Sequence, residues 1–195
     1  MPVNKFSRQR GGAAVEFALV VVIFLTFVFG VLELARSMYL FNTIKEATRR
    51  AANAAANVDY RDTARLDAVR QAAVFRQSAG PLLLGDPVTD AHVRIDYLAA
   101  TRAEDGTLSL APIAKSAMPS CPARNKVICT NDPNDPSCIR FVRARICQSG
   151  NGDSCTAVRY KTAFPLIDLP LPIPTAPTIV SAETLGFVEG MLPCP

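Results

Sequence analysis

The sequence GGAAVEFALVVVIFLTFVFGVLEL, residues 11–34, decides the organisation of this 195-residue chain. No charged residue interrupts it between Phe17 and Leu32. The stretch from Ala13 to Leu34 would form a helix of roughly 33 Å, which is enough to cross a hydrocarbon core of about 30 Å. We therefore expect a single membrane-spanning helix.

A cleaved secretory signal would have a different pattern. Signal peptides have an apolar core of about 7–15 residues, followed by a cleavage site of small residues. Here the apolar core is longer, and the charged sequence Glu33-Leu34-Ala35-Arg36 follows it. We therefore assign residues 12–35 to a transmembrane helix that stays attached to the chain.

The helix is expected to continue beyond the membrane. Residues 42–57 contain neither proline nor glycine and are rich in alanine. Alanine has the highest helix propensity and leaves a slim face that allows close packing. The sequence therefore predicts one helix from about Gly12 to Val58, with residues 36–58 outside the lipid.

All six cysteines lie far downstream of the span: Cys121, Cys129, Cys138, Cys147, Cys155 and Cys194. An even number on one side of a membrane span predicts three disulfides made in an oxidising compartment, but not how they pair. A zinc site is disfavoured, because there is no C-x-x-C motif and His92, the single histidine, is remote. We expect no metal site.

The orientation of the helix follows from the cysteines more than from the flanking charges. The leader, residues 1–11, carries three basic residues, but basic residues also follow the span. The cysteine-rich region needs an oxidising compartment. We therefore expect a cytoplasmic N-terminus, with residues 59–195 forming a periplasmic or extracellular domain.

The pattern of this domain predicts an α+β fold, in which the long helix packs on a small antiparallel sheet. A second helix should begin after Asp62 as N-cap and stop at Gly80-Pro81, with an apolar face formed by Leu66, Val69, Ala73 and Phe75. Strands are expected at 93–97, at 139–147 with a bulge between Phe141 and Val142, at 157–164 and at 178–188. A proline-rich connector should precede the last strand, and a disulfide-rich loop region should lie between Cys121 and Cys155.

The sequence offers little support for catalysis or for nucleic-acid binding. The formal charge of +4 is dispersed, with no clustered basic face. No G-x-S-x-G, H-E-x-x-H or P-loop motif is present. Residues 130–136 offer oxygen ligands, but they lack the glycine and distal glutamate of a calcium loop, so a turn is expected there. We expect no enzyme activity and no cofactor.

A carboxylate at the start of a membrane span is costly, so Glu16 needs a reason. Cleavage between Gly11 and Gly12 would create a positive amine and make Glu16 the fifth residue of the product. That amine, on the same helix or a neighbouring one, is a natural counter-ion for a carboxylate in a low dielectric. Cleavage would also remove the basic leader.

The sequence Gly11-Gly12-Ala13-Ala14-Val15-Glu16-Phe17, followed by an unbroken apolar run, resembles a type IV prepilin cleavage site. Over about residues 10–57 the chain is similar to the TadE-like family, the pseudopilins of tight-adherence (Flp) pilus systems. The Glu-Phe pair, Gly30, the segment from Glu33 to Arg36 and the alanine-rich segment carry this likeness. The cysteine spacing does not contribute to the likeness.

The resemblance implies that a prepilin peptidase removes residues 1–11 at the Gly11–Gly12 junction, leaving a pseudopilin or minor pilin in the bacterial inner membrane. Glu16 would guide the helix into an assembling complex, and Phe17 would belong to the same recognition motif. The implied partners are the membrane, the peptidase, other pilins or pseudopilins and the pilus assembly platform, with a location on the pilus or cell surface after assembly.

Two other interpretations stay open at this stage. Glu16 could be an incidental interfacial charge, and the chain a membrane-anchored periplasmic binding domain. An anchored hydrolase would need a nucleophile and a base that the sequence does not reveal. The sequence also leaves open whether the role is that of TadE or of its sister pseudopilin.

Overall fold

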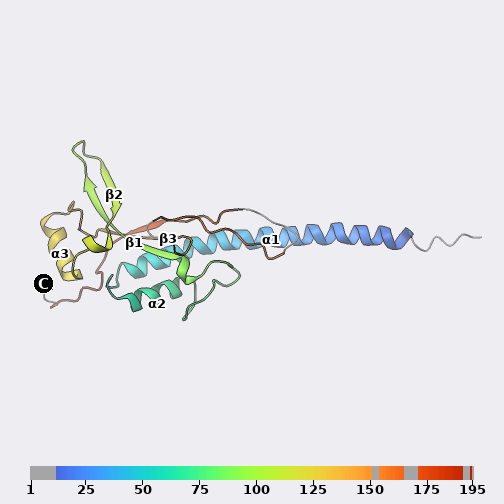
Figure 1. Cartoon of the computed structure of the whole chain (residues 1–195), viewed down its shortest axis with the longest axis horizontal. Helices are drawn as coiled ribbons and strands as arrows, with labels where there is room; N and C mark the ends of the chain where they lie inside the picture. The colour runs from blue at the N-terminus through green and yellow to red at the C-terminus, as the bar shows by residue number, and fades with distance from the viewer. Residues whose placement is uncertain (1–11, 151–153, 165–170, 191–193, 195) are drawn as a thin grey trace, which may run out of the picture.

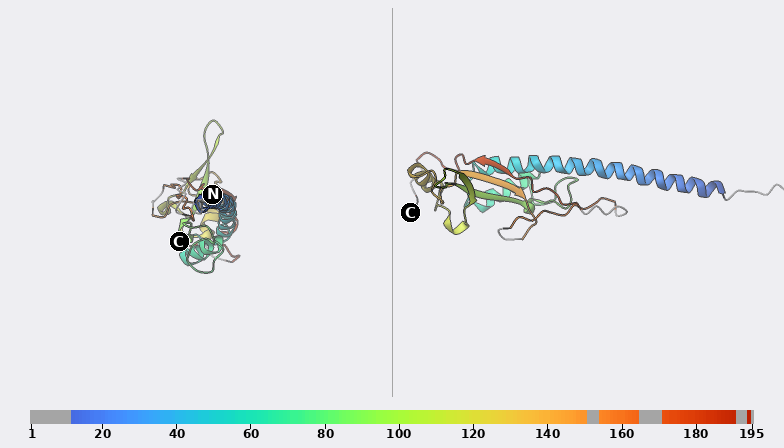
Figure 2. Two further views of the ribbon diagram at one scale, coloured as in Figure 1. Left: turned by 90° about the vertical axis from the view of Figure 1, so that its right-hand side faces the viewer. Right: turned by 90° about the horizontal axis from the view of Figure 1, so that it is seen from above.

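The computed structural model describes residues 12–150, 154–164, 171–190 and 194. Helix α1 (Gly12–Ala55) runs along the long axis of the molecule, and the remaining elements pack around its C-terminal half (Figure 1). Its N-terminal half projects away from this domain, as the view from above also shows (Figure 2, right). The α+β prediction, a long helix packed on a small antiparallel sheet, is confirmed.

One face of α1 is buried against the domain. The buried residues recur every three or four positions, which is the spacing of residues on one side of a helix. The buried residues are Glu33, Ser37, Leu40, Ile44, Ala47, Thr48, Ala51, Ala52 and Ala55. The small side chains in the last two turns allow the sheet to approach the helix backbone closely. The alanine-rich segment is therefore a packing surface.

Helix α1 ends at Ala55, three residues earlier than expected. The carbonyl of Ala56 accepts hydrogen bonds from the backbone amides of Glu183 (3.2 Å) and Leu185 (3.0 Å). The C-terminal segment of the chain therefore takes the acceptor that a further helical turn would have used.

Helix α2 (Thr63–Ala73) begins as predicted, with the Asp62 side chain accepting from the backbone amide of Arg65. Leu66, Val69 and Ala73 form its buried face as predicted, but Phe75 lies beyond the helix and is exposed. The expected end at Gly80-Pro81 is wrong, because Phe75 adopts a positive φ of 61° and breaks the helix earlier.

The sheet has four antiparallel strands in the order β2-β1-β3-β4. Their bounds are β1 (Val93–Arg102), β2 (Leu108–Pro112), β3 (Phe141–Ile146) and β4 (Thr178–Ser181). Strand β2 was not predicted. With the end of β1 it forms a hairpin that projects from the body of the domain (Figure 1).

The predicted bulge in the third strand is wrong. Strand β3 pairs with β1 without an extra residue, from Leu98↔Phe141 to Val93↔Ile146. The irregular apolar pattern arises because Ile139 lies before the strand. There the Asn125 side chain accepts from its backbone amide at 2.8 Å and donates to its carbonyl at 3.3 Å.

The predicted strand at 157–164 is reduced to one isolated bridge, Arg159↔Pro172. Its partner segment carries Pro172, which has no amide hydrogen to extend a ladder. The last strand, β4, is also shorter than the predicted range 178–188. The connector before it falls partly outside the described residues.

All six cysteines are paired, as Cys121–Cys194, Cys129–Cys138 and Cys147–Cys155. The region predicted as disulfide-rich loop also contains helix α3 (Pro122–Asn131), which Pro122 begins at a position that suits proline. Two short 3₁₀ helices, η1 (Asp90–His92) and η2 (Lys115–Ala117), complete the described elements.

Candidate functional site

The residues predicted to act in processing and assembly lie on the projecting part of α1. Gly12 is its first residue, and Glu16 and Phe17 are both exposed, Phe17 at 70%. Gly11 lies outside the described residues. The side chains of Glu16 and Phe17 are therefore accessible to lipid or to another protein.

By length and composition α1 could cross a membrane, and among the described residues it is the one helix that could. None of its most apolar 18-residue window is buried in the domain. The apolar half of α1 is therefore exposed over most of its length, whereas the stripe from Glu33 onward is buried.

The buried stripe begins with a carboxylate, Glu33, whose residue is only 1% exposed. Tyr160 donates its hydroxyl to Glu33 Oε1 at 2.5 Å, and the backbone amide of Ala163 donates to Oε2 at 3.1 Å. Arg36, one turn further along α1, forms an ion pair with Glu33 at 3.2 Å. A buried carboxylate is tolerated when it is paired and hydrogen-bonded in this way.

Arg36 extends this network to two loops. Its guanidinium donates to the backbone carbonyls of Leu84 (3.1 Å), Asp86 (3.0 Å) and Lys161 (2.8 Å). It also lies over the ring of Tyr160, 5.3 Å from the centroid. A guanidinium presents five donors in a rigid plane, so it can hold several carbonyls at once. We call Glu33, Arg36 and Tyr160 the helix clamp.

The clamp changes the chemistry of its tyrosine. Burial and the hydrogen bond to Glu33 raise the pKa of Tyr160 to about 12. The hydroxyl is therefore a proton donor throughout the physiological range and serves to satisfy the carboxylate. The clamp fixes the domain to α1 at the end of its apolar half.

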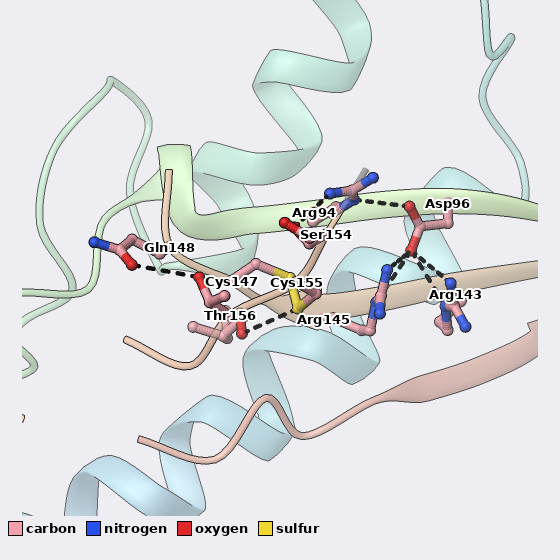
Figure 3. The surroundings of a disulfide bond; sticks show 10 residues. Arg94, Asp96, Arg143, Arg145, Cys147, Gln148, Ser154, Cys155 and Thr156 are labelled. Atoms are coloured by element: carbon pink, nitrogen blue, oxygen red, sulfur yellow. Dashed lines mark hydrogen bonds and ion pairs between the residues drawn. A yellow bond between two sulfur atoms is a disulfide. The ribbon is translucent and has the colours of Figure 1, made fainter. Parts of the chain in front are cut away.

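A second charged cluster lies on the sheet. Asp96 on β1 accepts from Arg94 at 2.9 Å, and from Arg143 and Arg145 on β3 at 3.1 and 2.6 Å (Figure 3). The register places Asp96 directly opposite Arg143 and places Arg94 opposite Arg145. Burial alone would raise the pKa of Asp96, but the hydrogen bonds and charges of these arginines outweigh it and lower the pKa.

The Cys147–Cys155 disulfide lies beside this cluster and closes the chain that follows β3 (Figure 3). Next to the bridge, Gln148 donates its backbone amide to the carbonyl of Thr156 at 2.9 Å. The carbonyl of Ser154 accepts from Arg94 at 3.1 Å. The disulfide and the arginine cluster together fix the exit from β3, and we assign both a structural role.

Sequence reasoning placed Glu33 and Arg36 in the segment that carries the family likeness but did not identify the clamp. A local signal was present, since an acid and a base three residues apart at the end of an apolar span can pair. The partner Tyr160 could not be found in this way, because it lies 127 residues from Glu33 in sequence.

The fold and site thus define a class: a long helix with an exposed apolar half, carrying a disulfide-bonded α+β domain on its other half. Residues 11–53 match the family model described as TadE-like protein, which confirms the resemblance over less than a quarter of the chain. The matched segment contains Glu16 and Phe17, together with Glu33 and Arg36 of the clamp. No curated protein and no solved structure matches the chain.

Proposed function

We propose that this chain is a pilin-like structural or assembly protein, a pseudopilin or minor pilin of a tight-adherence type IV pilus, without catalytic activity of its own. The match of residues 11–53 to the TadE-like family carries the proposal. The exposed apolar half of α1 supports it, since such a helix needs lipid or neighbouring helices around it.

In this proposal the chain has four parts: a leader (1–11), a transmembrane helix (12–35), its extramembrane continuation (36–58) and a periplasmic domain (59–195). The three disulfides support an oxidising compartment for the domain. The leader would lie in the cytoplasm. The partners would be a prepilin peptidase, other pilins or pseudopilins, and the assembly platform.

Glu16 and Phe17 would belong to the recognition motif that follows the cleaved bond. A carboxylate within the apolar half of α1 is unfavourable in lipid, so it calls for a cationic partner. The amine released at Gly12 would supply one. Because Glu16 is exposed on α1, it is open to such a partner on a neighbouring helix.

Processing tests the proposal. In native membranes with the peptidase present, the protein should begin at Gly12, as measured by N-terminal sequencing and intact mass. A Gly11→Leu variant and a strain lacking the peptidase should both keep residues 1–11. If the unaltered chain keeps its leader while a known prepilin in the same membranes is cut, the proposal loses its main support.

The alternative is a membrane-anchored binding domain with no pilus role. One observation favours it: a groove of about 600 Å³ between α3 and residues 181–187, where Lys126, Arg140 and Glu183 are among the lining residues. Under this alternative the helix is a plain tether, so the leader should be retained. The processing experiment therefore separates the two functions.

A further inference from the structure

Two adjacent leucines between α2 and β1 are among the most exposed large apolar residues of the domain. Leu83 is 71% exposed and Leu84 is 66% exposed. Single exposed leucines are common on soluble surfaces, whereas neighbouring ones next to an apolar helix indicate a contact surface. The nature of that contact follows from how the loop is built and where it lies.

The loop holds these leucines rigidly. Its flanking residues Leu82 and Val88 are buried in the core, and the Leu82 amide donates to the Val88 carbonyl at 2.8 Å. A turn closes between Leu82 and Gly85 at 3.0 Å, and a side chain at Gly85 would collide with Leu82 at 2.6 Å. The exposed pair is therefore held out by an ordered turn.

The backbone at Leu84 is constrained as well. Leu84 adopts a φ of 55°, which is uncommon for a residue other than glycine. Its carbonyl accepts the hydrogen bond from Arg36 of the helix clamp at 3.1 Å. The clamp therefore sets the position of the leucine pair along α1.

That position corresponds to the edge expected for a bilayer crossed by α1. Arg36 lies about 36 Å from Gly12 along the helix, and helix side chains lean toward the N-terminus, here toward Glu33 at about 32 Å. A hydrocarbon core that begins near Gly12 ends after about 30 Å. If α1 spans a membrane in this register, Leu84 lies at the lipid boundary.

A second segment contacts α1 about one helical turn closer to its N-terminus. The ring of Phe164 packs on Phe29 of α1 with centroids 4.6 Å apart, about 26 Å from Gly12 along the axis. Lys161 pairs with Asp86 at 3.5 Å and so joins this segment to the leucine loop. Figure 1 shows both segments on the side of the domain that faces the projecting half of α1.

We propose that residues 82–86 and 161–164 form a lipid-facing base, in which Leu83 and Leu84 insert into the outer leaflet around the end of the transmembrane helix. Lys161, on the rim, would lie among the lipid headgroups, where a long cationic side chain is favourable. The occupant is lipid, because the base adjoins the apolar half of α1, whose most apolar window is not buried by any described residue. The inference rests on α1 spanning a membrane and not on the pilus role, so the processing result leaves it intact.

The chain contains no tryptophan, so a single introduced tryptophan reports its own surroundings. The full chain would carry Leu83→Trp or Leu84→Trp and be reconstituted into phosphatidylcholine vesicles brominated near the headgroup end of the acyl chains. Leu19→Trp, within the apolar half of α1, is the buried-in-lipid reference. Leu108→Trp is the matched aqueous control, since Leu108 lies in the projecting hairpin and is 54% exposed.

The expected result is a blue-shifted emission for both loop variants and a loss of intensity with brominated lipid, while the hairpin control shows neither. Equal emission and equal quenching for the loop variants and the hairpin control would overturn the inference. A blue shift without bromine quenching, growing with the protein-to-lipid ratio, would instead assign the surface to a second copy of the chain and would also overturn it.

Discussion

The hydroxyl of Tyr160 donates a hydrogen bond of 2.5 Å to the carboxylate of Glu33, across 127 residues of sequence. This bond ties the loop after β3 to the point where the apolar half of α1 meets the domain. Because Glu33 is almost fully buried, its carboxylate is compensated by the described residues Tyr160, Ala163 and Arg36. Removing any of these partners should therefore lower the free energy of unfolding.

Glu33→Gln should lower the free energy of unfolding by about 2–4 kcal/mol. Breaking a buried pair costs about 3–5 kcal/mol when the other charge is left alone, but Arg36 keeps its carbonyl acceptors. Denaturant unfolding of the full chain in detergent measures the loss. Glu46→Gln is the matched control, because Glu46 pairs with Arg50 at the exposed surface of the same helix and its substitution should change the stability much less.

Tyr160→Phe completes a double-mutant cycle with Glu33→Gln. Alone it should cost about 1.5–3 kcal/mol, the usual range for a hydrogen bond to a charged group. If the two residues act as one unit, the double variant should lose less than the sum of the single losses. Strict additivity, or a Glu33→Gln loss no larger than that of Glu46→Gln, would argue against the clamp.

The Asp96 cluster predicts a dependence on acid. Since the folded pKa of Asp96 is lowered, its contribution is present above the unfolded pKa and is lost as the pH falls through the folded pKa. Asp96→Asn would remove the carboxylate charge that Arg143 and Arg145 share, and should cost about 1.5–3 kcal/mol at neutral pH.

The variant should also lose less stability than the unaltered chain when the pH is lowered below about 4, as followed by denaturant unfolding at stepped pH. Asp67→Asn is the control, because Asp67 is exposed and pairs only with Arg70 among the described residues. Equal acid sensitivity for Asp96→Asn and the unaltered chain would exclude Asp96 as the source.

The three disulfides should differ in what they contribute. In the chain-entropy model, a bridge across 73 residues is worth about 4 kcal/mol, and one across 9 residues about 2.5 kcal/mol. Replacing Cys121 and Cys194 together by serine should therefore lower the unfolding midpoint more than replacing Cys129 and Cys138. The opposite order, measured on the same preparation, would show that local packing outweighs loop length.

The parts of the fold that sequence predicted correctly are those with local signals. Helix α1 follows from composition, and α2 follows from its Asp62 cap and apolar spacing. The wrong predictions fall where residues distant in sequence determine the local backbone structure. The backbone at Ile139 is fixed by a hydrogen bond to Asn125. The strand expected at 157–164 forms only one bridge, because its partner segment contains Pro172. The candidate site divides in the same way, since Glu16 is visible as an anomaly in an apolar run but the partner of Glu33 is not.

The last prediction separates an assembly element from a plain anchor. Glu16→Gln keeps the size of the side chain and removes its charge, and a neutral amide is cheaper to place in lipid. An incidental interfacial charge could therefore be replaced without harm. If Glu16 pairs with a freed amine in the assembling complex, the variant should still insert and form its disulfides but should lose incorporation into pili.

The size of that loss follows from the environment of the pair. Deleting one partner in a low dielectric can cost about 3–5 kcal/mol, and even half of this exceeds the roughly 1.4 kcal/mol that corresponds to a tenfold change. The assay is pilus formation with the variant as sole copy, scored beside cleavage and membrane level. Glu46→Gln, an exposed substitution of the same chemistry on the same helix, should assemble normally. Normal pili from Glu16→Gln at normal protein level would identify the helix as a tether, because the charge would then have no partner in assembly.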